Sequence, residues 1–381
     1  MISLKKALLF IAGIAAGMAA LGTTPADTAS IAEGPPAASS GRGIYYPNPD
    51  SVNHNFKGYI WPTDASRKIT SSFAEYRSAH FHGGIDISTN GTVGHKVYSV
   101  QDGYLYRIRI TPDGYGKMLY VRHPDGYVSA YAHLHSFNEK IGELARAEQY
   151  RTGSYEIDLV YDTPVVRLKK GEVIAYTGDT GFGPPHLHFE IRDSELNPVN
   201  PLLGKSFRME DDIPPAIYRF LVRPLAAGST VNDHDDPRIY SRFPRKNGAY
   251  RIGEKIRVHG EIGFGVETKD RSNGVGGRTG VHTMELTLDG ETVFHASLNA
   301  IPLLKTKQIN IHYDLPMIVE GKGRFQKLYI EKGNELPLYD RTPADGGIIR
   351  TDRLSEGDHA FTVRCTDIYG NPSTLTGTIV V

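Results

Sequence analysis

Short runs of alternating apolar and polar residues, separated by turn signals, make up most of this chain from residue 59 onward. Alternation with a period of two places successive side chains on opposite faces of a strand. Asp-Gly pairs at 102–103, 113–114 and 125–126 favour the tight turns of β-hairpins. This pattern predicts an antiparallel β domain over residues 58–210. The exception is a polar stretch at 138–163, which predicts a surface excursion with helical character.

A second patterned region follows a candidate linker, Asp-Asp-Ile-Pro-Pro, at 211–215. Alternation resumes there in five segments: 217–222, 255–261, 282–288, 327–330 and 359–365. Their spacing is typical of a sandwich of short strands, so we expect an Ig-like β-sandwich domain of unknown role over 215–381. The many glycines and charged residues at 263–280 predict long loops in that stretch.

The N-terminus has the pattern of an export signal. Lys5 and Lys6 precede an apolar stretch at 7–21, which is short for a membrane span and suits the core of a signal peptide. We expect a signal peptide over 1–22, with an uncleaved membrane anchor as the alternative, and a flexible linker over 23–57. No cysteine follows the apolar stretch, so no lipoprotein anchor is expected. The predicted location is the periplasm, the cell envelope or the extracellular space.

Charge and cysteine content argue against several classes of function. The 43 basic and 43 acidic residues cancel, so no overall field favours nucleic acid or an anionic membrane. The single cysteine, Cys365, excludes an intramolecular disulfide and a thiolate metal cluster. Because Cys365 lies in the alternating run 360–365, we expect a buried strand thiol and not a nucleophile.

Histidines gather in short segments, of which 186–191 (His-Leu-His-Phe-Glu-Ile) is the easiest to interpret. In a strand, His186, His188 and Glu190 share one face, and the apolar residues between them face a core. Two imidazoles at a spacing of two suit one metal ligand beside one group that handles protons or stabilises an anion. Glu190 is a group that orients an imidazole, a member of a salt bridge, or the solvated end of the strand.

Another segment places His82 four residues before Asp86. A straight strand would hold the two residues roughly 13 Å apart at about 3.3 Å per residue, whereas each zinc ligand lies about 2 Å from the metal. Gly83 and Gly84 allow the bend that brings them together. With His188 these residues provide three ligands and leave a fourth position open for water, which is the catalytic type of zinc site.

The ordered set of motifs resembles the lysostaphin-like, or LytM-type, zinc metallopeptidases. The family has His-x-x-x-Asp, then Tyr-x-His, then His-x-His, which match 82–86, 131–133 and 186–188 here. The resemblance covers about 60–203. It implies one Zn²⁺ per chain, bound by His82, Asp86 and His188. It also implies catalytic roles for His133 and His186.

The implied activity is that of an exported zinc metalloendopeptidase that hydrolyses peptidoglycan, at its stem peptides or cross-bridges. Metal-activated water attacks the scissile carbonyl, while one histidine accepts a proton and another stabilises the oxyanion. Which role falls to His133 and which to His186 stays open, as does the bond cleaved. The excursion at 138–163 is longer than the family's compact members need, and we expect it to edge the substrate groove.

Two other functions stay open. Some relatives have lost the zinc ligands and activate other cell-wall hydrolases, but this chain keeps all five site residues and lacks the long coiled coils typical of such scaffolds. A peptidase acting on other proteins outside the cell is the third possibility. His80 and His135 are expected to be bystanders, with His80 as the alternative to His82. The sequence pattern does not indicate which oligomeric state the protein adopts.

Overall fold

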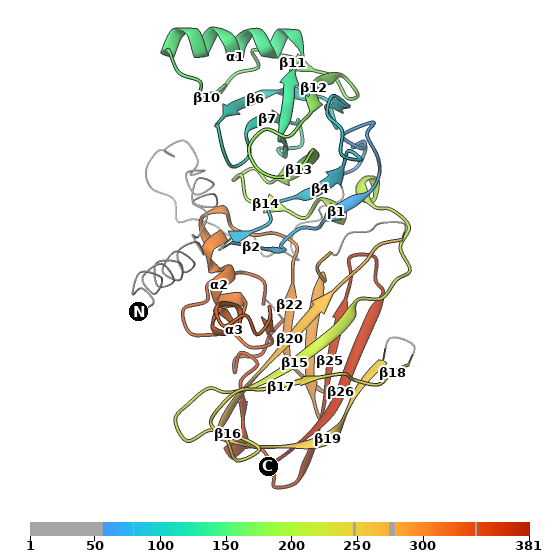
Figure 1. The fold of residues 1–381 in the computed structure, drawn as a ribbon, viewed down its shortest axis with the longest axis vertical. Coiled ribbons are helices and arrows are strands. Elements are labelled where there is room, and N and C mark those ends of the chain that lie inside the picture. Colours follow the sequence, from blue (N-terminus) through green and yellow to red (C-terminus); the bar gives the residue numbers. More distant parts are fainter. Residues whose placement is uncertain (1–55, 79, 247–248, 274–278, 340) are drawn as a thin grey trace, which may run out of the picture.

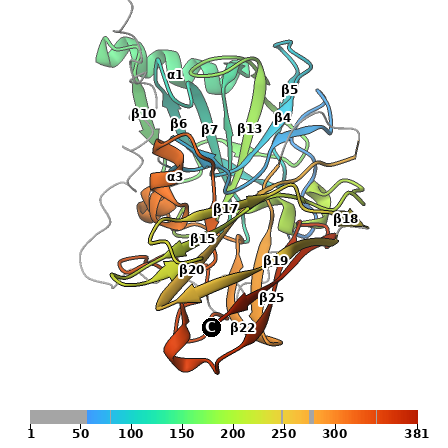
Figure 2. The same ribbon diagram turned by 60° about the horizontal axis from the view of Figure 1, so that its bottom comes forward.

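The computed structural model describes residues 56–78, 80–246, 249–273, 279–339 and 341–381. The predicted signal peptide and most of the predicted linker lie outside the described residues. None of the helices in the described part has the length and apolar character that crossing a bilayer requires. The chain is mostly β-structure, as expected, and its strands gather into an upper and a lower part, with α1 (Glu139–Thr152) at the upper end (Figure 1, Figure 2).

The upper part is built on a nine-stranded sheet whose neighbouring strands are all antiparallel. Its spatial order is β1 (Ile69–Ser71), β4 (Ile85–Ser88), β13 (His186–Arg192), β8 (Val128–Ala132), β7 (Lys117–Arg122), β6 (Gly103–Ile110) and β10 (Ile157–Val160), with β14 (Pro198–Val199) beside β13 and β11 (Arg167–Leu168) beside β6. A three-stranded sheet joins β5 (Lys96–Tyr98), β12 (Val173–Thr177) and β9 (Leu134–Phe137). The short helices η3 (Pro201–Leu203) and η4 (Lys205–Phe207) close this part.

Apolar residues at alternate strand positions fill the upper core. Leu187, Phe189 and Ile191 of β13 are fully buried there, as the alternation predicted. Phe56, at the end of the predicted linker, already belongs to this core and packs against Phe207. Phe56 therefore belongs to the upper part and not to a linker.

The lower part is a sandwich of two sheets. One sheet contains β17 (Arg238–Ser241), β15 (Ala216–Pro224), β20 (Glu261–Lys269), β23 (Gln326–Lys327) and β24 (Ile349–Arg350). The other contains β16 (Thr230–Val231), β19 (Ala249–His259), β26 (Pro372–Val380), β25 (Asp358–Thr366), β21 (Thr283–Leu288), β22 (Glu291–Ser297) and β18 (Arg245–Lys246). Phe220 of β15 stacks on Phe361 of β25 at a centroid distance of 5.1 Å, which joins the two sheets across one core. The predicted β-sandwich is thus confirmed.

Two expectations need correction. The stretch 138–163 forms α1, begun by the Asn138 cap and ended by Gly153, and then β10, which pairs with β6 at the edge of the sheet. It is therefore part of the sheet as well as a surface helix. The expected long loops at 263–280 are wrong for residues up to 269, which belong to β20. Gly263 stands there because a Cβ would meet the Tyr329 ring at 2.5 Å, so close packing and not a loop requires this glycine.

Short helices in the lower part lie where the alternation gave no signal. They are η5 (Leu303–Gln308), α2 (Ile309–His312), α3 (Leu315–Val319) and η6 (Thr351–Arg353). Cys365 is buried in β25, as expected.

A hairpin of the upper chain segment packs into the lower core. It consists of β2 (Tyr76–Arg77) and β3 (His80–Phe81), and it lies at the junction of the two parts (Figure 1). Phe73 and Phe81 are buried among the apolar side chains of the sandwich and not among those of the upper sheet. The Tyr76 hydroxyl donates to Asn310 Oδ1 (2.9 Å), and the Phe81 N–H donates to Thr306 Oγ1 (3.2 Å). The predicted boundary at 211–215 stays a prediction, but the cores do not divide there.

Candidate metal centre

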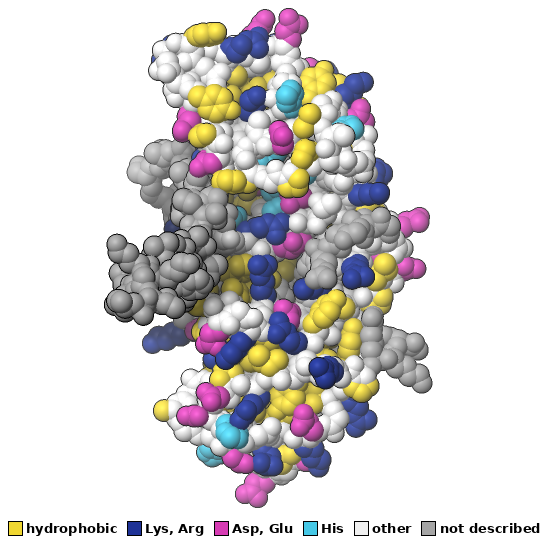
Figure 3. Space-filling model, viewed as in Figure 1, with side chains coloured by type: hydrophobic (Ala, Val, Ile, Leu, Met, Phe, Trp, Pro, Cys, Tyr) yellow, Lys and Arg dark blue, Asp and Glu magenta, His cyan; other side chains and the backbone are white. Residues whose placement is uncertain are grey.

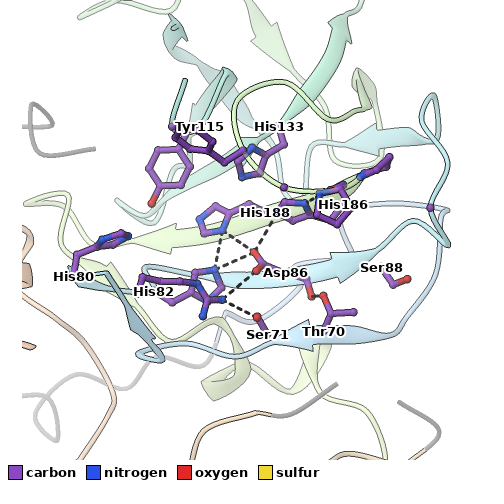
Figure 4. A pocket seen from close by; sticks show the side chains of 17 residues that line it. Thr70, Ser71, His80, His82, Asp86, Ser88, Tyr115, His133, His186 and His188 are labelled. Atoms are coloured by element: carbon purple, nitrogen blue, oxygen red, sulfur yellow. Dashed lines mark hydrogen bonds and ion pairs between the residues drawn. The ribbon is translucent and has the colours of Figure 1, made fainter. Parts of the chain in front are cut away.

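Three predicted ligands, His82, Asp86 and His188, converge on one point. His82 Nε2 lies 3.0 Å from both Asp86 Oδ1 and His188 Nδ1, and His188 Nδ1 lies 2.9 Å from Asp86 Oδ1. Figure 4 shows the three side chains pointing toward one another, Asp86 from β4, His188 from β13 and His82 from the bend before β4. They are two nitrogens and one carboxylate oxygen, a donor set that suits a metal ion.

Strand pairing and two glycines create this convergence. Asp86 of β4 and His188 of β13 are direct cross-strand partners. His82 reaches them because the chain bends between β3 and β4, as expected. The physical reason differs from the expected one, since neither Gly83 nor Gly84 has a positive φ. A Cβ on Gly84 would meet the Phe189 carbonyl oxygen at 2.2 Å, so the bend passes too close to β13 for any side chain.

Hydrogen bonds on the far side of each ring fix the tautomers. His82 Nδ1 faces the Ser72 carbonyl (2.7 Å), and His188 Nε2 faces the Glu190 carboxylate (2.8 Å). Both far-side partners are acceptors, so these nitrogens carry the protons. In the neutral form of each ring, His82 Nε2 and His188 Nδ1 are then the unprotonated nitrogens, and they face each other and the Asp86 carboxylate. In that form the three atoms leave room for a cation.

The pKa values follow from the same contacts. Burial alone would raise the pKa of Asp86, but His82 and His188 hold it well below its usual value. Burial alone would lower the pKa of His188, yet Asp86 and Glu190 raise it to about 9. The site thus attracts positive charge strongly.

Glu190 is fully buried and links His188 to Arg192. Its Oε1 accepts from His188 Nε2 and from the Tyr115 hydroxyl (3.1 Å), and its Oε2 accepts from Arg192 Nε (2.6 Å). Burial would raise the pKa of Glu190, but the charges of Arg192 and His188 lower it, so the carboxylate stays ionised. Both roles weighed for Glu190, orienting an imidazole and pairing with a cation, are present together.

His133 and His186 lie beside the three-residue cluster with their rings 4.4 Å apart. His133 Nδ1 faces the Thr180 carbonyl and His186 Nδ1 faces the Pro184 carbonyl, each at 2.8 Å. Their Nε2 atoms are therefore lone pairs. Burial, reinforced by the neighbouring imidazoles, lowers the pKa of His133 to about 3, and burial also lowers the pKa of His186. His133 adopts φ +58° in the kink between β8 and β9, a conformation that residues other than glycine rarely adopt.

All five predicted residues line one cavity of about 580 Å³. Figure 3 shows histidine side chains inside a recess on the face drawn in Figure 1. Its walls come from 70–91, the turn at 114–115 and the Gly-Pro-rich loop at 182–185. No described residue of 138–163 lines the cavity, so the expectation that this stretch edges the groove is wrong for this cavity.

The two bystander histidines behave differently. His80 lines the cavity but is not one of the three converging residues, whereas the side chain of His135 is exposed. This geometry does not support His80 as a metal ligand in place of His82.

Two further residues of the cavity were not predicted. Arg77 Nη2 donates to Ser71 Oγ (2.7 Å) and to Asp86 Oδ2 (3.4 Å), while Tyr115 packs its ring 4.9 Å from the His188 ring. Tyr115 follows one of the Asp-Gly turn signals, which marked the turn but not its function. Arg77 stands in no motif, because only the packing of the hairpin brings it to Asp86.

Comparison with known proteins identifies one domain of the chain. Residues 80–150 match the sequence model of Peptidase family M23. The chain carries an M23 domain. The resemblance to the lysostaphin-like family is thereby confirmed, and the matched segment holds His82, Asp86 and His133.

Curated relatives of the M23 domain include proteins named as activators. The murein hydrolase activator NlpD of Escherichia coli K12 is 32% identical over 142 residues, covering 37% of this chain and 30% of the relative. NlpD of Salmonella dublin is 29% identical over 180 residues, covering 47% and 37%. The chain thus spans about a third of the length of the curated relatives it matches. A zinc-containing peptidase from Vibrio cholerae is 27% identical with a TM-score of 0.29, covering 40% of each chain.

Proposed function

We propose that this chain is an exported zinc metalloendopeptidase that hydrolyses peptide bonds of bacterial peptidoglycan. The observation that carries the proposal is the convergence of three donor atoms, from His82, Asp86 and His188, beside two neutral imidazoles in one cavity. The substrate is supported by the M23 domain and by relatives named for murein hydrolase activation. Export is supported by the apolar stretch at 7–21.

The donor set fits zinc. Atoms that bind zinc at about 2.0 Å in a tetrahedron lie roughly 3.3 Å from one another. The 2.9–3.0 Å separations in this cluster are close to that value. His82 Nε2, Asp86 Oδ1 and His188 Nδ1 would hold the ion, and the cavity leaves its remaining side accessible to substrate.

The proposed mechanism uses the metal and one of the two neutral histidines. Bound zinc supplies Lewis acidity, which lowers the pKa of water to about 7 and polarises a carbonyl. His133 or His186, neutral and with a bare Nε2, accepts the proton as water adds to the scissile carbonyl carbon. The same proton then passes to the leaving amine as the C–N bond breaks. The backbone carbonyls of Thr180 and Pro184 hold the two rings in place.

A second candidate function is non-enzymatic activation of other cell-wall hydrolases. The names of the relatives favour it, since both NlpD proteins are called activators. In that case the cavity serves as a docking site and needs no turnover.

The deciding experiment incubates purified mature protein with cross-linked peptidoglycan and identifies released fragments by mass spectrometry. We expect fragments with new peptide termini, one zinc per chain by elemental analysis, and loss of both after His188→Ala. His133→Ala should lower the rate by about 10²- to 10⁴-fold and leave the zinc content at one per chain.

His135→Ala provides the matched control, because this exposed imidazole lies outside the cavity lining. Absence of cleavage by zinc-loaded protein, combined with stimulation of a separate purified amidase, would establish the activator function instead. Cleavage that survives both chelation and His188→Ala would rule out the metal mechanism.

A further inference from the structure

Three aspartates from distant segments form a second cluster in the lower part. Asp211 precedes β15, Asp270 follows β20, and Asp367 follows β25. Each offers a carboxylate oxygen, and these oxygens lie within 4.8 Å of one another. Like charges at this spacing repel unless a cation or protons neutralise them.

Two of the three carboxylates are buried, so water does not stabilise their charges. Asp270 is only 3% exposed, and Asp367 is only 2% exposed. Asp270 Oδ1 and Asp211 Oδ2 are both buried and have no hydrogen-bond partner. An ionised carboxylate in that state is strongly unfavourable unless something else coordinates it.

The existing contacts position the carboxylates without neutralising them. Asp211 Oδ1 accepts from the N–H groups of Ile213 and Asn273, at 3.3 and 3.2 Å. Asp270 Oδ2 accepts from the Thr279 hydroxyl at 3.2 Å. Asp367 accepts from the Tyr369 N–H (2.9 Å) and from both the N–H (2.8 Å) and the side-chain amide (2.8 Å) of Asn371. All of these donors are uncharged, and no Lys or Arg within the described ranges forms an ion pair with the three aspartates.

We propose that Asp211, Asp270 and Asp367 bind a divalent cation, and that this cation is Ca²⁺. The donors are oxygens only, with no imidazole or thiolate, which selects a hard cation over zinc. Calcium accepts six to eight oxygen ligands in flexible geometry and tolerates carboxylates from separate loops, whereas Mg²⁺ demands a near-ideal octahedron.

The proposed cation fastens the linker to both sheets of the sandwich. Asp211 lies at the exit from the M23 domain, while Asp270 and Asp367 come from loops that follow one strand of each sheet. The Asn371 side chain, which donates to the Asp211 carbonyl (3.0 Å), already joins two of these segments. This inference does not depend on the activity of the M23 domain.

The test is calorimetric titration of chelator-treated full-length protein with CaCl₂, followed by thermal unfolding with and without calcium. We expect one Ca²⁺ per chain, weaker binding of Mg²⁺, and a rise in Tm on adding calcium. Asp270→Asn and Asp367→Asn should each weaken calcium binding at least tenfold. Asp212→Asn is the matched control, since it removes a neighbouring but exposed charge, and it should bind calcium like the parent.

His188→Ala separates the two metal sites, because it removes a ligand of the first cluster and should leave calcium binding intact. The proposal is overturned if the parent protein shows no calcium binding at millimolar concentration, or if Asp270→Asn binds calcium as tightly as the parent. It is also overturned if Asp270→Asn raises Tm while calcium leaves the Tm of the parent unchanged, since protons would then neutralise the cluster.

Discussion

At the scale of single residues, hydrogen bonds outside the cluster decide what the site can bind. The Ser72 carbonyl and the Glu190 carboxylate take the far-side protons of His82 and His188, so both near-side nitrogens are left as donors to a metal. The sequence motif indicates which histidines converge. It contains no information about their tautomers, because Ser72 belongs to a different segment.

Glu190→Gln should weaken the metal centre without touching a ligand. A neutral amide holds the proton of His188 Nε2 less firmly than a carboxylate, so we expect zinc affinity to fall by about 10- to 100-fold. Competition with a chromogenic chelator measures the affinity, and circular dichroism checks the fold. Glu195→Gln, at an exposed position of the same chain segment, is the control. An unchanged affinity would show that Glu190 serves Arg192 alone.

His312 should make the protein less stable in acid. This buried imidazole contacts the Tyr339 hydroxyl through Nδ1 (2.7 Å), and burial, with the charge of Lys327, lowers its pKa to about 3. Between pH 6.5 and 3 the unfolded chain takes up a proton that the folded chain refuses. Stability from this group is therefore complete above pH 6.5 and falls by about 1.4 kcal/mol per pH unit below it.

Urea unfolding at pH 7, 5.5 and 4 measures this effect. His312→Phe should unfold with a shallower dependence on pH than the parent, because it removes one titrating group. The exposed His135, replaced in the same way, should leave the pH dependence as it was. Equal slopes for His312→Phe and the parent would contradict the assignment.

At the scale of elements, β13 explains why so much of the site was predictable. Strict alternation along 186–191 separates the site face from the core face, and strand geometry alone then places His186, His188 and Glu190 together. The pairing of β13 with β4 adds Asp86. The remaining site residues were predicted from the order of the family's motifs, because no local rule connects His133 to this strand.

Glycines were harder to interpret from sequence. Those at 263 and 265 suggested loops, yet both lie inside β20, and at Gly263 the Tyr329 ring occupies the space of a Cβ. The pair at 83–84 suggested a bend, which is present for a different reason. A single sequence shows where glycine is present. It does not show whether a positive φ or a lack of space for a Cβ requires that glycine. Arg77 was missed for a related reason, as its contact with Asp86 depends on tertiary packing.

Gly84→Ala should therefore damage the metal centre through the backbone. The added Cβ would meet the Phe189 carbonyl oxygen at 2.2 Å, and relief requires β4 and β13 to move apart. We expect a loss of about 3 kcal/mol in unfolding free energy and a large drop in zinc affinity. Gly253→Ala is the matched control, since a Cβ there meets no atom within 4 Å. Equal stability of both variants would contradict this account.

At the scale of the whole molecule, the two parts share the hairpin of β2 and β3. Phe73 and Phe81 lie in the lower core. In the same segment, His82 is one of the three converging residues, and Arg77 contacts Asp86. Contacts of Tyr76 and Phe81 with 306–313 reinforce the junction. Sequence patterning predicted β-structure in both parts but gave no sign of this sharing, because each half of the hairpin is too short to show a period.

Removal of the lower part should consequently disable the upper part. A chain ending at residue 210 exposes Phe73 and Phe81, and burial of each such ring contributes about 3 kcal/mol. We expect the truncated chain to bind zinc at least tenfold more weakly than the full chain and to unfold at lower temperature. Elemental analysis and calorimetry measure both. A truncated chain with the zinc affinity and Tm of the parent would show that the hairpin holds its position unaided.

The shared hairpin also sets the order of events during synthesis. Phe81 contacts Thr306, which lies 225 residues downstream, and His312, so the wall beside the three candidate ligands lacks this support until that segment is in place. A nascent chain that ends before Thr306 holds all three candidate ligands but lacks this support. Assembly of the site is thereby delayed until that segment of the lower part has been made.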